Sequence, residues 1–456
     1  MKIQPELLDY DIFPKVISEK KETLITIKPL GGHVHFEEKE YTLHILGLED
    51  GAIRNYKDRK NLYKTLVKVD DDKCIRFRYT FPKEQMYYIR LIKTDGKELV
   101  ELCVYAVAPD LAGRYPFAGD LHFHTSFSDG KQAPEIAVAN CRKIGYDFMA
   151  ITDHERYYPS LLVKEFYKDV PIDLNLVPGE EVHLAKADED HINDIHIVNF
   201  GGEYSINAMF EYKHIAEVGD DKKLRSLYGE CPEVKTIREM NEMLDRMAEK
   251  ADIPEGIERY AYTACKFIFD EIRKANGLGI FCHPYWLSNV QQVPETFLDY
   301  MMETQPFDAF EVLGGENYFE HNGFQTIRYY EDLAKGRKYP IVGSTDCHNS
   351  VDSDRFPCKT IVFSRRNERK DLISSIKDFY SVAVDTISTE YRIVGDLRLV
   401  KYATFLMQNY FPIHDDLCFE EGRAMKAYAC GEEGSKETLE FLHGRCEKLL
   451  KKYFAF

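Results

Sequence analysis

The chain has 456 residues, of which 44% are hydrophobic, and it carries a formal net charge of −17. This length favours two or three domains, and the apolar content is sufficient for sizeable cores. The negative charge argues against a general nucleic-acid binder, because phosphate backbones are held mainly by Lys and Arg.

The sequence gives no indication of export, either from a signal peptide or from the cysteines. No apolar run is long enough to span a bilayer, and no apolar segment follows the basic residue near the N-terminus as it would in a signal peptide. The 11 cysteines form no Cys-x-x-Cys pair. We therefore expect reduced thiols and a cytoplasmic protein without a membrane partner.

Residues 1–116 contain short β-rich runs separated by turn residues. Strands at this spacing predict a small antiparallel β-sandwich domain. His33 and His35 form a His-x-His pair here, but no carboxylate or third histidine follows them in a comparable setting, so we expect them on the strand surface. The predicted strands are 23–28, 41–46, 75–81, 87–92 and 99–107.

Residues 117–391 change to strands that alternate with helices. Pro134 suits the first turn of a helix at 133–144, and Gly277 is expected to cap a helix at 266–274. A further helix is expected at 325–335. The predicted buried strands are 147–152, 175–183, 194–200, 278–282, 309–313 and 340–343.

Two segments depart from this alternation. Residues from about 203 to 262 are charged and mostly helical in pattern, most clearly at 235–251. We interpret them as an insertion, which is either a lid over the site or a decorative helical subdomain. Residues 392–456 are predicted to be a helical extension on the outside of the protein, with the clearest helix at 437–453.

Residues of the kinds that bind metal ions stand at the predicted strand ends. Side chains alternate along a strand, so His122 and His124 point to the same side. Parallel α/β barrels gather their strand ends at one mouth, where such ligands can converge. Nitrogen and carboxylate donors suit two or three Zn, Mn or Fe ions. The candidates are His122, His124, Asp129, His154, Glu180 or Glu181, His196, His283, Asp346 and His348.

Three neighbours of these candidates leave alternatives. His191 is the rival of His196, and Glu180 is the rival of Glu181. His183 follows the glutamates, and we expect it to be structural, on the other side of the strand.

Four more residues flank the candidates. Asp120 and Asp153 are expected to orient ligands or cap turns. Cys282 and Cys347 are expected to be small buried packing residues rather than ligands.

Arg355 is the candidate catalytic residue that does not bind metal. It lies nine residues past Asp346, and a guanidinium matches the oxygens of a phosphate group. The alternative for Arg355 is a surface salt bridge. Tyr285 and Trp286 follow His283 closely, and they either line the pocket or pack in the core.

Six runs in this region resemble, in order, the motifs of the polymerase and histidinol phosphatase (PHP) superfamily. They are DLHFHTSFSDG, ITDH, PGEEVHL, DIHIV, FCHP and GSTDCH, within about residues 117–390. The resemblance implies a distorted, TIM-barrel-like (β/α)7 barrel with a two- or three-metal site. The run RYPFAGDLHFHT also looks, more loosely, like the carbaryl-hydrolase-like branch of this superfamily.

The resemblance also implies a division of ligands among the ions. It favours Glu181 over Glu180, because the family's glutamate is the second residue after the glycine. The implied sets are His122, His124 and Asp346 for one ion; His196 and His283, with Glu181 bridging, for a second; and Asp129, His154 and His348 for a third.

The last motif departs from the family's usual Gly-Ser-Asp-Ala-His. Thr345 is inserted between Ser344 and Asp346, and Cys347 replaces the alanine. The Asp-x-His spacing survives, so we still expect both residues to bind metal.

Clustered ions would explain a hydrolase without a protein nucleophile. They acidify a water and neutralise charge on a phosphoryl group, while alignment of water and ester supplies further rate. We therefore predict a metal-dependent phosphoesterase whose partner is a small phosphorylated compound, without a stable nucleic-acid complex. The alternatives are a carboxylic or carbamate ester hydrolase that uses the same site, and a non-catalytic metal-binding module. The complete ligand set argues against the module.

Overall fold

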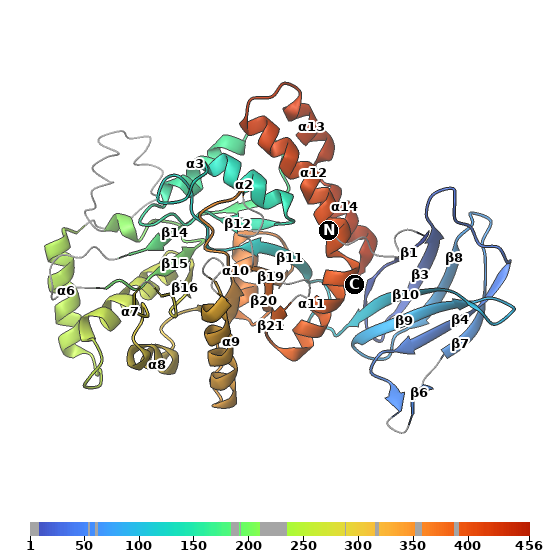
Figure 1. The fold of residues 1–456 in the computed structure, drawn as a ribbon, viewed down its shortest axis with the longest axis horizontal. Coiled ribbons are helices and arrows are strands. Elements are labelled where there is room, and N and C mark those ends of the chain that lie inside the picture. Colours follow the sequence, from blue (N-terminus) through green and yellow to red (C-terminus); the bar gives the residue numbers. More distant parts are fainter. Residues whose placement is uncertain are drawn as a thin grey trace. The chain divides into compact units, whose positions relative to one another are not determined.

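The computed structural model describes residues 9–52, 55–59, 63–183, 191, 193–209, 235–287, 289–314, 319–351, 358–386 and 392–456. The chain divides into two compact units (Figure 1). Residues of the predicted C-terminal extension are shared between these units. Unit 1 comprises Met1–Tyr115, Leu397–Leu417 and Gly444–Phe456, and unit 2 comprises Pro116–Asp396 and Cys418–His443.

Unit 1 contains two β-sheets whose side chains share one hydrophobic core. Ile25 and Ile27 enter this core from one sheet, and Ile89 and Leu91 enter it from the other, as the two-residue period of a strand requires. The smaller sheet has the order β1 (Tyr10–Phe13), β3 (Glu22–Pro29), β8 (Ile75–Thr80). The larger has the order β22 (Phe454–Ala455), β2 (Val16–Ser18), β10 (Glu98–Val107), β9 (Gln85–Ile92), β4 (Glu40–Gly47), β7 (Tyr63–Lys68).

The N-terminal region is therefore rich in β-sheet, as predicted, but it is not purely antiparallel. Strand β2 pairs in parallel with both β10 and β22. The C-terminal strand β22 was not predicted, because two residues are too few to show a periodicity. The described remainder of unit 1 includes the small sheet of β5 (Gly51–Ala52) and β6 (Asn55–Arg59), and the helices α11 (Leu397–Asn409) and α14 (Arg445–Tyr453).

Unit 2 contains two further sheets, which hold the predicted strands. Pro178 divides the single strand predicted at 175–183 into β13 and β14, which belong to different sheets. One sheet has the order β13 (Asn175–Val177), β12 (Phe148–Ala150), β11 (Tyr115–Asp120), β19 (Cys358–Ser364), β20 (Ser381–Asp385), β21 (Arg392–Val394). The other has the order β14 (Gly179–Val182), β15 (Ile197–Phe200), β16 (Leu278–Phe281), β17 (Ala309–Leu313), β18 (Ile341–Gly343).

This arrangement is a mixed α/β fold, and the predicted (β/α)7 barrel is not confirmed. Across the described residues the strands form two sheets rather than one closed ring. Strand β15 also runs antiparallel to both β14 and β16, whereas a (β/α) barrel needs parallel neighbours. Two isolated bridges, Phe123 with Cys347 and His154 with Glu181, connect the ends of the two sheets.

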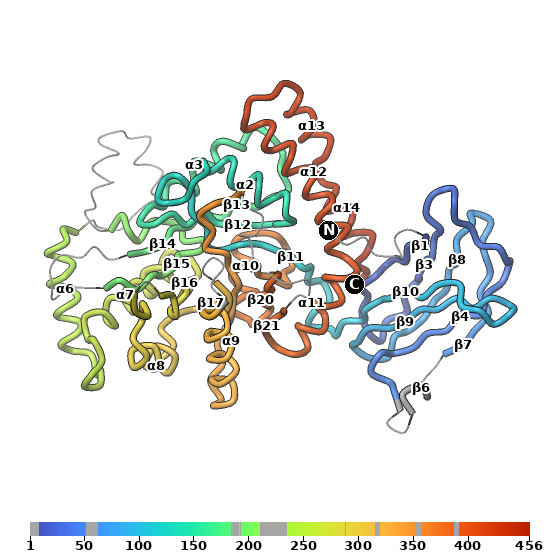
Figure 2. The backbone as a smooth tube through the Cα atoms, viewed as in Figure 1, coloured from blue at the N-terminus to red at the C-terminus, as the bar shows by residue number. Residues whose placement is uncertain are grey.

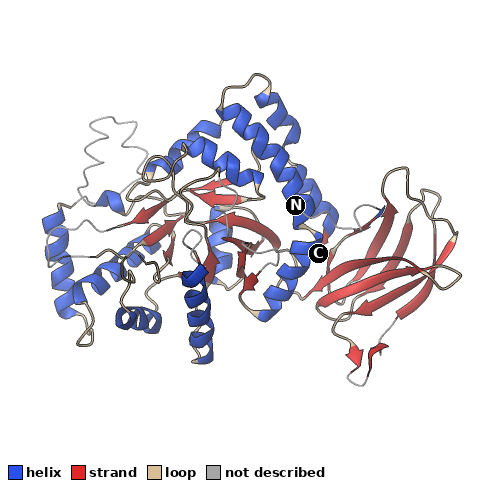
Figure 3. Ribbon diagram, in the orientation of Figure 1, coloured by secondary structure: helices blue, strands red, loops and turns tan. Residues whose placement is uncertain are grey.

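Helices surround these sheets, as Figure 3 shows by colour, and Figure 2 follows the same path as a tube. Helix α7 contacts β15 and β16, α9 contacts β17, and α10 contacts β19. The helices are α2 (Pro134–Lys143), α3 (Tyr158–Tyr167), α6 (Ile237–Lys250), α7 (Arg259–Lys274), α8 (Glu295–Thr304), α9 (Phe319–Ala334), α10 (Arg369–Lys377), α12 (Phe411–Ala429) and α13 (Ser435–Leu442), with a short 3-10 turn at Asn207–Met209.

The helix ends follow local sequence signals, with one correction. Thr236 and Glu239 form a reciprocal capping box at the start of α6. Helix α7 is ended by Asn276 rather than by the predicted Gly277. Asn276 takes the left-handed conformation, with φ +57°, and the Gly277 amide donates to the Ile272 carbonyl at 2.9 Å, as in a Schellman motif.

The structure describes only part of the predicted insertion, and it divides the predicted C-terminal helix in two. Residues 210–234 of the insertion lie outside the described residues, and the described part that follows is helical. The helix predicted at 437–453 is two helices, α13 and α14, separated at Gly444, whose φ is +75°. None of the described helices is long and apolar enough to cross a membrane.

Candidate metal centre

The first group of candidate ligands forms where the ends of the two unit 2 sheets meet. His122 and His124 follow β11, and Asp346 follows β18. Backbone bonds hold these segments together: the Asp346 amide donates to the His122 carbonyl at 3.0 Å, and the His124 amide donates to the Cys347 carbonyl at 3.1 Å. Glu181 enters from β14. We call His122, His124, Glu181 and Asp346 group 1.

The donor atoms of group 1 fit around one small cation. His124 Nε2 lies 2.9 Å from Asp346 Oδ1, and four further separations, among the two Nε2 atoms, Asp346 Oδ1 and Glu181 Oε2, are 3.2–3.3 Å. Tetrahedral ligands at about 2.0–2.1 Å from a metal lie roughly 3.3 Å from one another. Glu181 Oε2 and Asp346 Oδ1 are buried and have no hydrogen-bond partner. The two carboxylate oxygens thus lie close to the imidazole nitrogens without being aligned as hydrogen bonds, which is how the ligands of a cation lie.

A second group surrounds the same glutamate. Glu181 Oε2 lies 2.7 Å from His154 Nδ1, and Glu181 Oε1 lies 2.7 Å from His196 Nδ1. His183 joins them, with its Nε2 2.8 Å from His154 Nδ1. We call His154, Glu181, His183 and His196 group 2. Because its two oxygens face different histidines, Glu181 is placed to bridge two ions.

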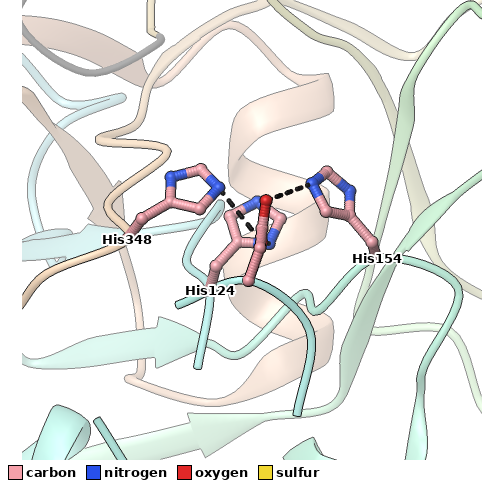
Figure 4. A group of neighbouring side chains, drawn as sticks. His124, His154 and His348 are labelled. Carbon is pink, nitrogen blue, oxygen red and sulfur yellow. Dashed lines mark ion pairs between the residues drawn. The ribbon is translucent and has the colours of Figure 1, made fainter. Parts of the chain in front are cut away.

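A third group lies on the more exposed side of the cluster, and Figure 4 shows three of its imidazoles directed toward one another. Asp129 Oδ2 lies 3.4 Å from His154 Nε2, and Asp129 Oδ1 lies 3.3 Å from His348 Nε2. His124 Nδ1 is 3.7 Å from Asp129 Oδ1. We call His124, Asp129, His154 and His348 group 3.

His283 lies beside groups 1 and 2. Its Nε2 is 3.3 Å from Glu181 Oε1, and its Nδ1 is 3.2 Å from Gln292 Oε1. Both His283 and Asp346 have positive φ, +26° and +51°. Such strained backbone in residues other than glycine is concentrated at functional sites, where the surrounding structure holds it.

Buried polar residues fix the loops that carry these side chains. The Asp120 carboxylate accepts bonds from the amides of His122 and Thr345 and from the Thr345 hydroxyl. The inserted Thr345 therefore ties the segment of Asp346 to the end of β11. The Asp153 carboxylate accepts bonds from the Thr125 amide and hydroxyl. Both aspartates thus accept hydrogen bonds from the segments that carry candidate ligands, and their orienting role stays a prediction.

The two adjacent glutamates face opposite sides of β14. Glu180 accepts hydrogen bonds from the Ser205 hydroxyl, the Ile206 amide and the side-chain amide of Asn207. Glu181 faces the histidines. The alternation of side chains along a strand therefore places Glu181, and not its rival Glu180, among the histidines.

The charges of the cluster shift several pKa values. Burial opposes ionisation of Glu181, but electrostatic interactions with the His154, His196 and His122 imidazoles outweigh burial and hold its pKa well below the usual range. Burial works against charged His154, but Glu181 and Asp129 raise its pKa to about 11. Burial lowers the pKa of His196 to about 3. The carboxylates thus stay ionised at neutral pH, and they attract positive charge to the centre of the cluster.

The structure brings the nine predicted ligands together in one cluster. Their role as ligands stays a prediction. His196 precedes β15 rather than lying inside a strand, and it reaches the cluster because β15 is antiparallel to its neighbours. His191 lies 3.0 Å from Asp245 and not in any of the three groups. His33 and His35 are exposed in unit 1, as predicted, but they lie in the loop between β3 and β4 rather than on a strand. Arg355 lies outside the described residues.

Sequence reasoning missed three residues of the site. The prediction that His183 lies on the other side of the strand is wrong, because Glu181 and His183 are two positions apart and share a side, and His183 Nε2 lies 2.8 Å from His154 Nδ1. Glu311, inside β17, is fully buried with its Oε2 3.3 Å from His122 Nδ1. A glutamate inside an apolar strand run was the available signal for it. Gln292 had no signal in the sequence.

Comparisons with known proteins bear on this cluster. Residues 120–251 match the model of the PHP domain. The chain is 34% identical over 86 residues to the DNA polymerase/3'-5' exonuclease PolX of Bacillus subtilis, and this match covers 17% of this chain and 15% of that protein. It is 29% identical over 150 residues to the 5'-3' exoribonuclease Rnm of Escherichia coli, covering 32% of this chain and 44% of that protein. The chain thus spans less than half the length of these curated relatives.

A solved two-domain protein from Bacteroides vulgatus, described as containing a predicted PHP-like metal-dependent phosphoesterase, is similar over 66% of this chain and 72% of that chain. The sequence identity is 15% and the TM-score is 0.42. These values are too low to extend the domain assignment.

The relatives contradict our prediction of a small phosphate ester as the partner, without nucleic acid. The names of both relatives describe enzymes that act on nucleic acid, a DNA polymerase/3'-5' exonuclease and a 5'-3' exoribonuclease. The prediction failed because it used the net charge of the whole chain, whereas an ion-filled site supplies its own positive charge where the phosphate binds. The matched model and the order of the motifs agree, and the chain contains a PHP domain, as the resemblance predicted.

Proposed function

We propose that unit 2 is a metal-dependent phosphoesterase that hydrolyses phosphodiester bonds of nucleic acid. The observation that carries this proposal is the convergence of three donor groups on shared residues, above all on Glu181. The nucleases among the matched relatives support the choice of substrate class.

The nine predicted ligands would hold two or three divalent ions, of Zn, Mn or Fe. When bound, the ions would acidify a water and neutralise charge on the phosphoryl group. Glu181 would bridge, because its two oxygens face different histidines. Asp120 and Asp153 would keep the ligand-bearing loops in place through their buried hydrogen bonds.

Burial across the cluster indicates where the substrate would approach. The His122, His124 and Glu181 side chains are fully buried. Asp129, by contrast, has 56% of its side chain exposed, and His154 has 27% exposed. We expect the phosphodiester to reach the cluster from the side of group 3, where solvent already has access.

The cysteine at the cluster is a poor candidate for a competing nucleophile. Cys282 is buried, and its Sγ lies 3.2 Å from the His196 carbonyl oxygen. Burial raises the pKa of the Cys282 thiol well above its usual value, so the thiolate that would attack a substrate is not formed at neutral pH.

The test uses the full chain, incubated with Zn²⁺ or Mn²⁺, and 5'-labelled RNA and DNA oligonucleotides. We expect cleavage that stops on chelation, and loss of cleavage in His124→Ala but not in His191→Ala. Nucleoside monophosphates and p-nitrophenyl acetate complete the panel.

Other outcomes would contradict the proposal. Ester hydrolysis without oligonucleotide cleavage would favour the carboxylic or carbamate ester hydrolase. Metal binding without turnover of any substrate would favour the non-catalytic module.

A further inference from the structure

His183 lies within group 2, although neither its sequence position nor the family resemblance placed it among the ligands. Its Nε2 is 2.8 Å from His154 Nδ1 and 3.8 Å from Glu181 Oε2. The His183 and His196 ring centroids are 3.8 Å apart. The donor atoms of His154, Glu181, His183 and His196 all lie within 4.8 Å of one another.

The backbone of His183 is positioned for this contact. Its amide donates to the Asn207 side-chain oxygen at 3.4 Å, and the Asn207 amide nitrogen donates to the Glu181 carbonyl at 3.3 Å and to the Glu180 carboxylate at 3.0 Å. The end of β14 is thus tied to the turn at Asn207–Met209. With the strand fixed, the two-residue period directs Glu181 and His183 to the same side.

A hydrogen bond between the two imidazoles does not account for the group. His154 Nδ1 lies 2.7 Å from Glu181 Oε2 and 2.8 Å from His183 Nε2. A ring nitrogen carries one proton at most, so His154 Nδ1 can donate to only one of these two atoms. His196 Nδ1 is buried and has no hydrogen-bond partner, although it is 2.7 Å from Glu181 Oε1. Three nitrogens and a carboxylate that converge in this way suit a divalent cation.

We infer that His183 binds one of the divalent ions through Nε2, together with His154, Glu181 and His196, as a ligand additional to the nine predicted ones. This inference rests on the proposed function, because it assumes that the cluster holds ions. It differs from the resemblance, which gives the second ion His196 and His283 with Glu181.

The direct test is nuclear magnetic resonance of the full chain labelled with ¹⁵N-histidine, recorded without metal and with Zn²⁺. A ring nitrogen that binds zinc has a chemical shift different from that of a protonated or an unbound one. The resonances of His183 are assigned by their absence in His183→Gln. We expect the chemical shift of His183 Nε2 to move to the zinc-bound value. The chemical shifts of the His191 ring nitrogens should not change.

Calorimetric titration with Zn²⁺ and with Mn²⁺ gives a second readout. We expect His183→Gln to weaken one class of sites by at least about 10-fold. The matched control is His191→Gln, which changes a histidine near Asp245, outside the three groups, and should bind within twofold of wild type. Circular dichroism of the metal-free variants checks the fold, and His183→Asn is the replacement if His183→Gln does not fold.

The possible results separate the two claims. If wild type binds Zn²⁺ and His183 Nε2 does not shift, or the His183→Gln titration matches wild type, the inference is overturned and the proposed function stands. Weaker binding without a shift at His183 Nε2 also overturns it, since His183 would then only orient His154. If wild type binds neither Zn²⁺ nor Mn²⁺, both claims fail.

Discussion

At the scale of single residues, the adjacent Glu180 and Glu181 on β14 have different surroundings. Glu180 is surrounded by hydrogen-bond donors, and Glu181 is surrounded by imidazoles. Both are fully buried. The two side chains are chemically identical, so only the direction in which each points distinguishes the carboxylate that faces hydrogen-bond donors from the one that faces the candidate metal ligands.

This contrast predicts a pair of variants with opposite effects. Glu180→Gln should lower the free energy of unfolding of the metal-free protein by about 1–3 kcal/mol, because the new amide nitrogen cannot accept the bonds that the carboxylate accepted. Glu181→Gln should leave metal-free stability less affected, but should reduce the Zn²⁺ bound per chain. Denaturant unfolding in EDTA and elemental analysis measure the two effects. Equal metal content in both variants would contradict the assignment of Glu181.

A second prediction at the scale of residues concerns Glu311 and the nearby Gly314. A Cβ at Gly314 would lie 1.6 Å from Glu311 Oε1, so an alanine there must displace the carboxylate that contacts His122. Partners of this kind typically contribute 10- to 100-fold to metal affinity, and we expect Gly314→Ala to weaken Zn²⁺ binding by about that factor. Calorimetric titration provides the measurement. Unchanged affinity in Gly314→Ala would show that Glu311 does not position His122.

Much of the site could be predicted at this scale, for a physical reason. Metal-binding side chains that end apolar runs are rare enough to stand out, as with His122 and Asp346. Glu311 and Gln292 could not be found in the same way. Glu311 lies in the middle of a strand, and Gln292 reaches His283 through the path of a loop that has no periodicity.

At the scale of elements, the order of strands was predictable and their pairing was not. Hydrophobic runs located most unit 2 strands, because burial on both faces leaves an unbroken apolar pattern. Such a run looks the same for either strand direction. The strand at β15 was predicted, but its antiparallel direction was not. The position of His196 before its strand was therefore not predicted either.

Two glycines in helices make a testable contrast at this scale. A Cβ at Gly323 in α9 would meet nothing within 4 Å, whereas a Cβ at Gly422 in α12 would lie 2.4 Å from the Lys143 backbone nitrogen. Gly323→Ala should raise the free energy of unfolding by about 0.5–1 kcal/mol, since alanine loses less backbone entropy in a helix. Gly422→Ala should lower it by about 1–3 kcal/mol, because α12 must move away from α2. Denaturant unfolding of both variants measures the difference.

Gly323→Ala also serves as a control for Gly314→Ala, since both add one methyl group to unit 2. Zn²⁺ affinity should be unchanged in Gly323→Ala. If Gly422→Ala proved as stable as Gly323→Ala, the close approach of α12 to α2 would be wrong.

At the scale of the whole molecule, the chain has two compact units, and the candidate metal centre lies entirely in unit 2. The length of the chain indicated more than one domain, but it could not show that residues of the C-terminal segment belong to both units. That division depends on contacts between residues far apart in the chain, such as the pairing of β22 with β2. A two-residue strand leaves no pattern from which that pairing could be read.

Metal removal should therefore affect one unit and not the other. The single tryptophan, Trp286, belongs to unit 2 and lies three residues after His283, so its fluorescence follows unfolding of the unit that would hold the ions. A ligand that binds only the folded state at 100 times its dissociation constant stabilises that state by about 2.7 kcal/mol for each site. Zn²⁺ should shift the tryptophan unfolding curve to higher denaturant concentration, and EDTA should reverse the shift.

Scanning calorimetry of the same samples reports both units at once. We expect Zn²⁺ to raise the temperature of one transition and to leave the other in place, because all nine predicted ligands belong to unit 2 and none belongs to unit 1. His124→Ala should abolish the shift, and His191→Ala should retain it. A Zn²⁺-dependent shift of every transition would mean that the two units unfold together. Bound Zn²⁺ without any shift would mean that the ions sit away from the folded cluster, and it would remove the structural basis of the proposed hydrolase.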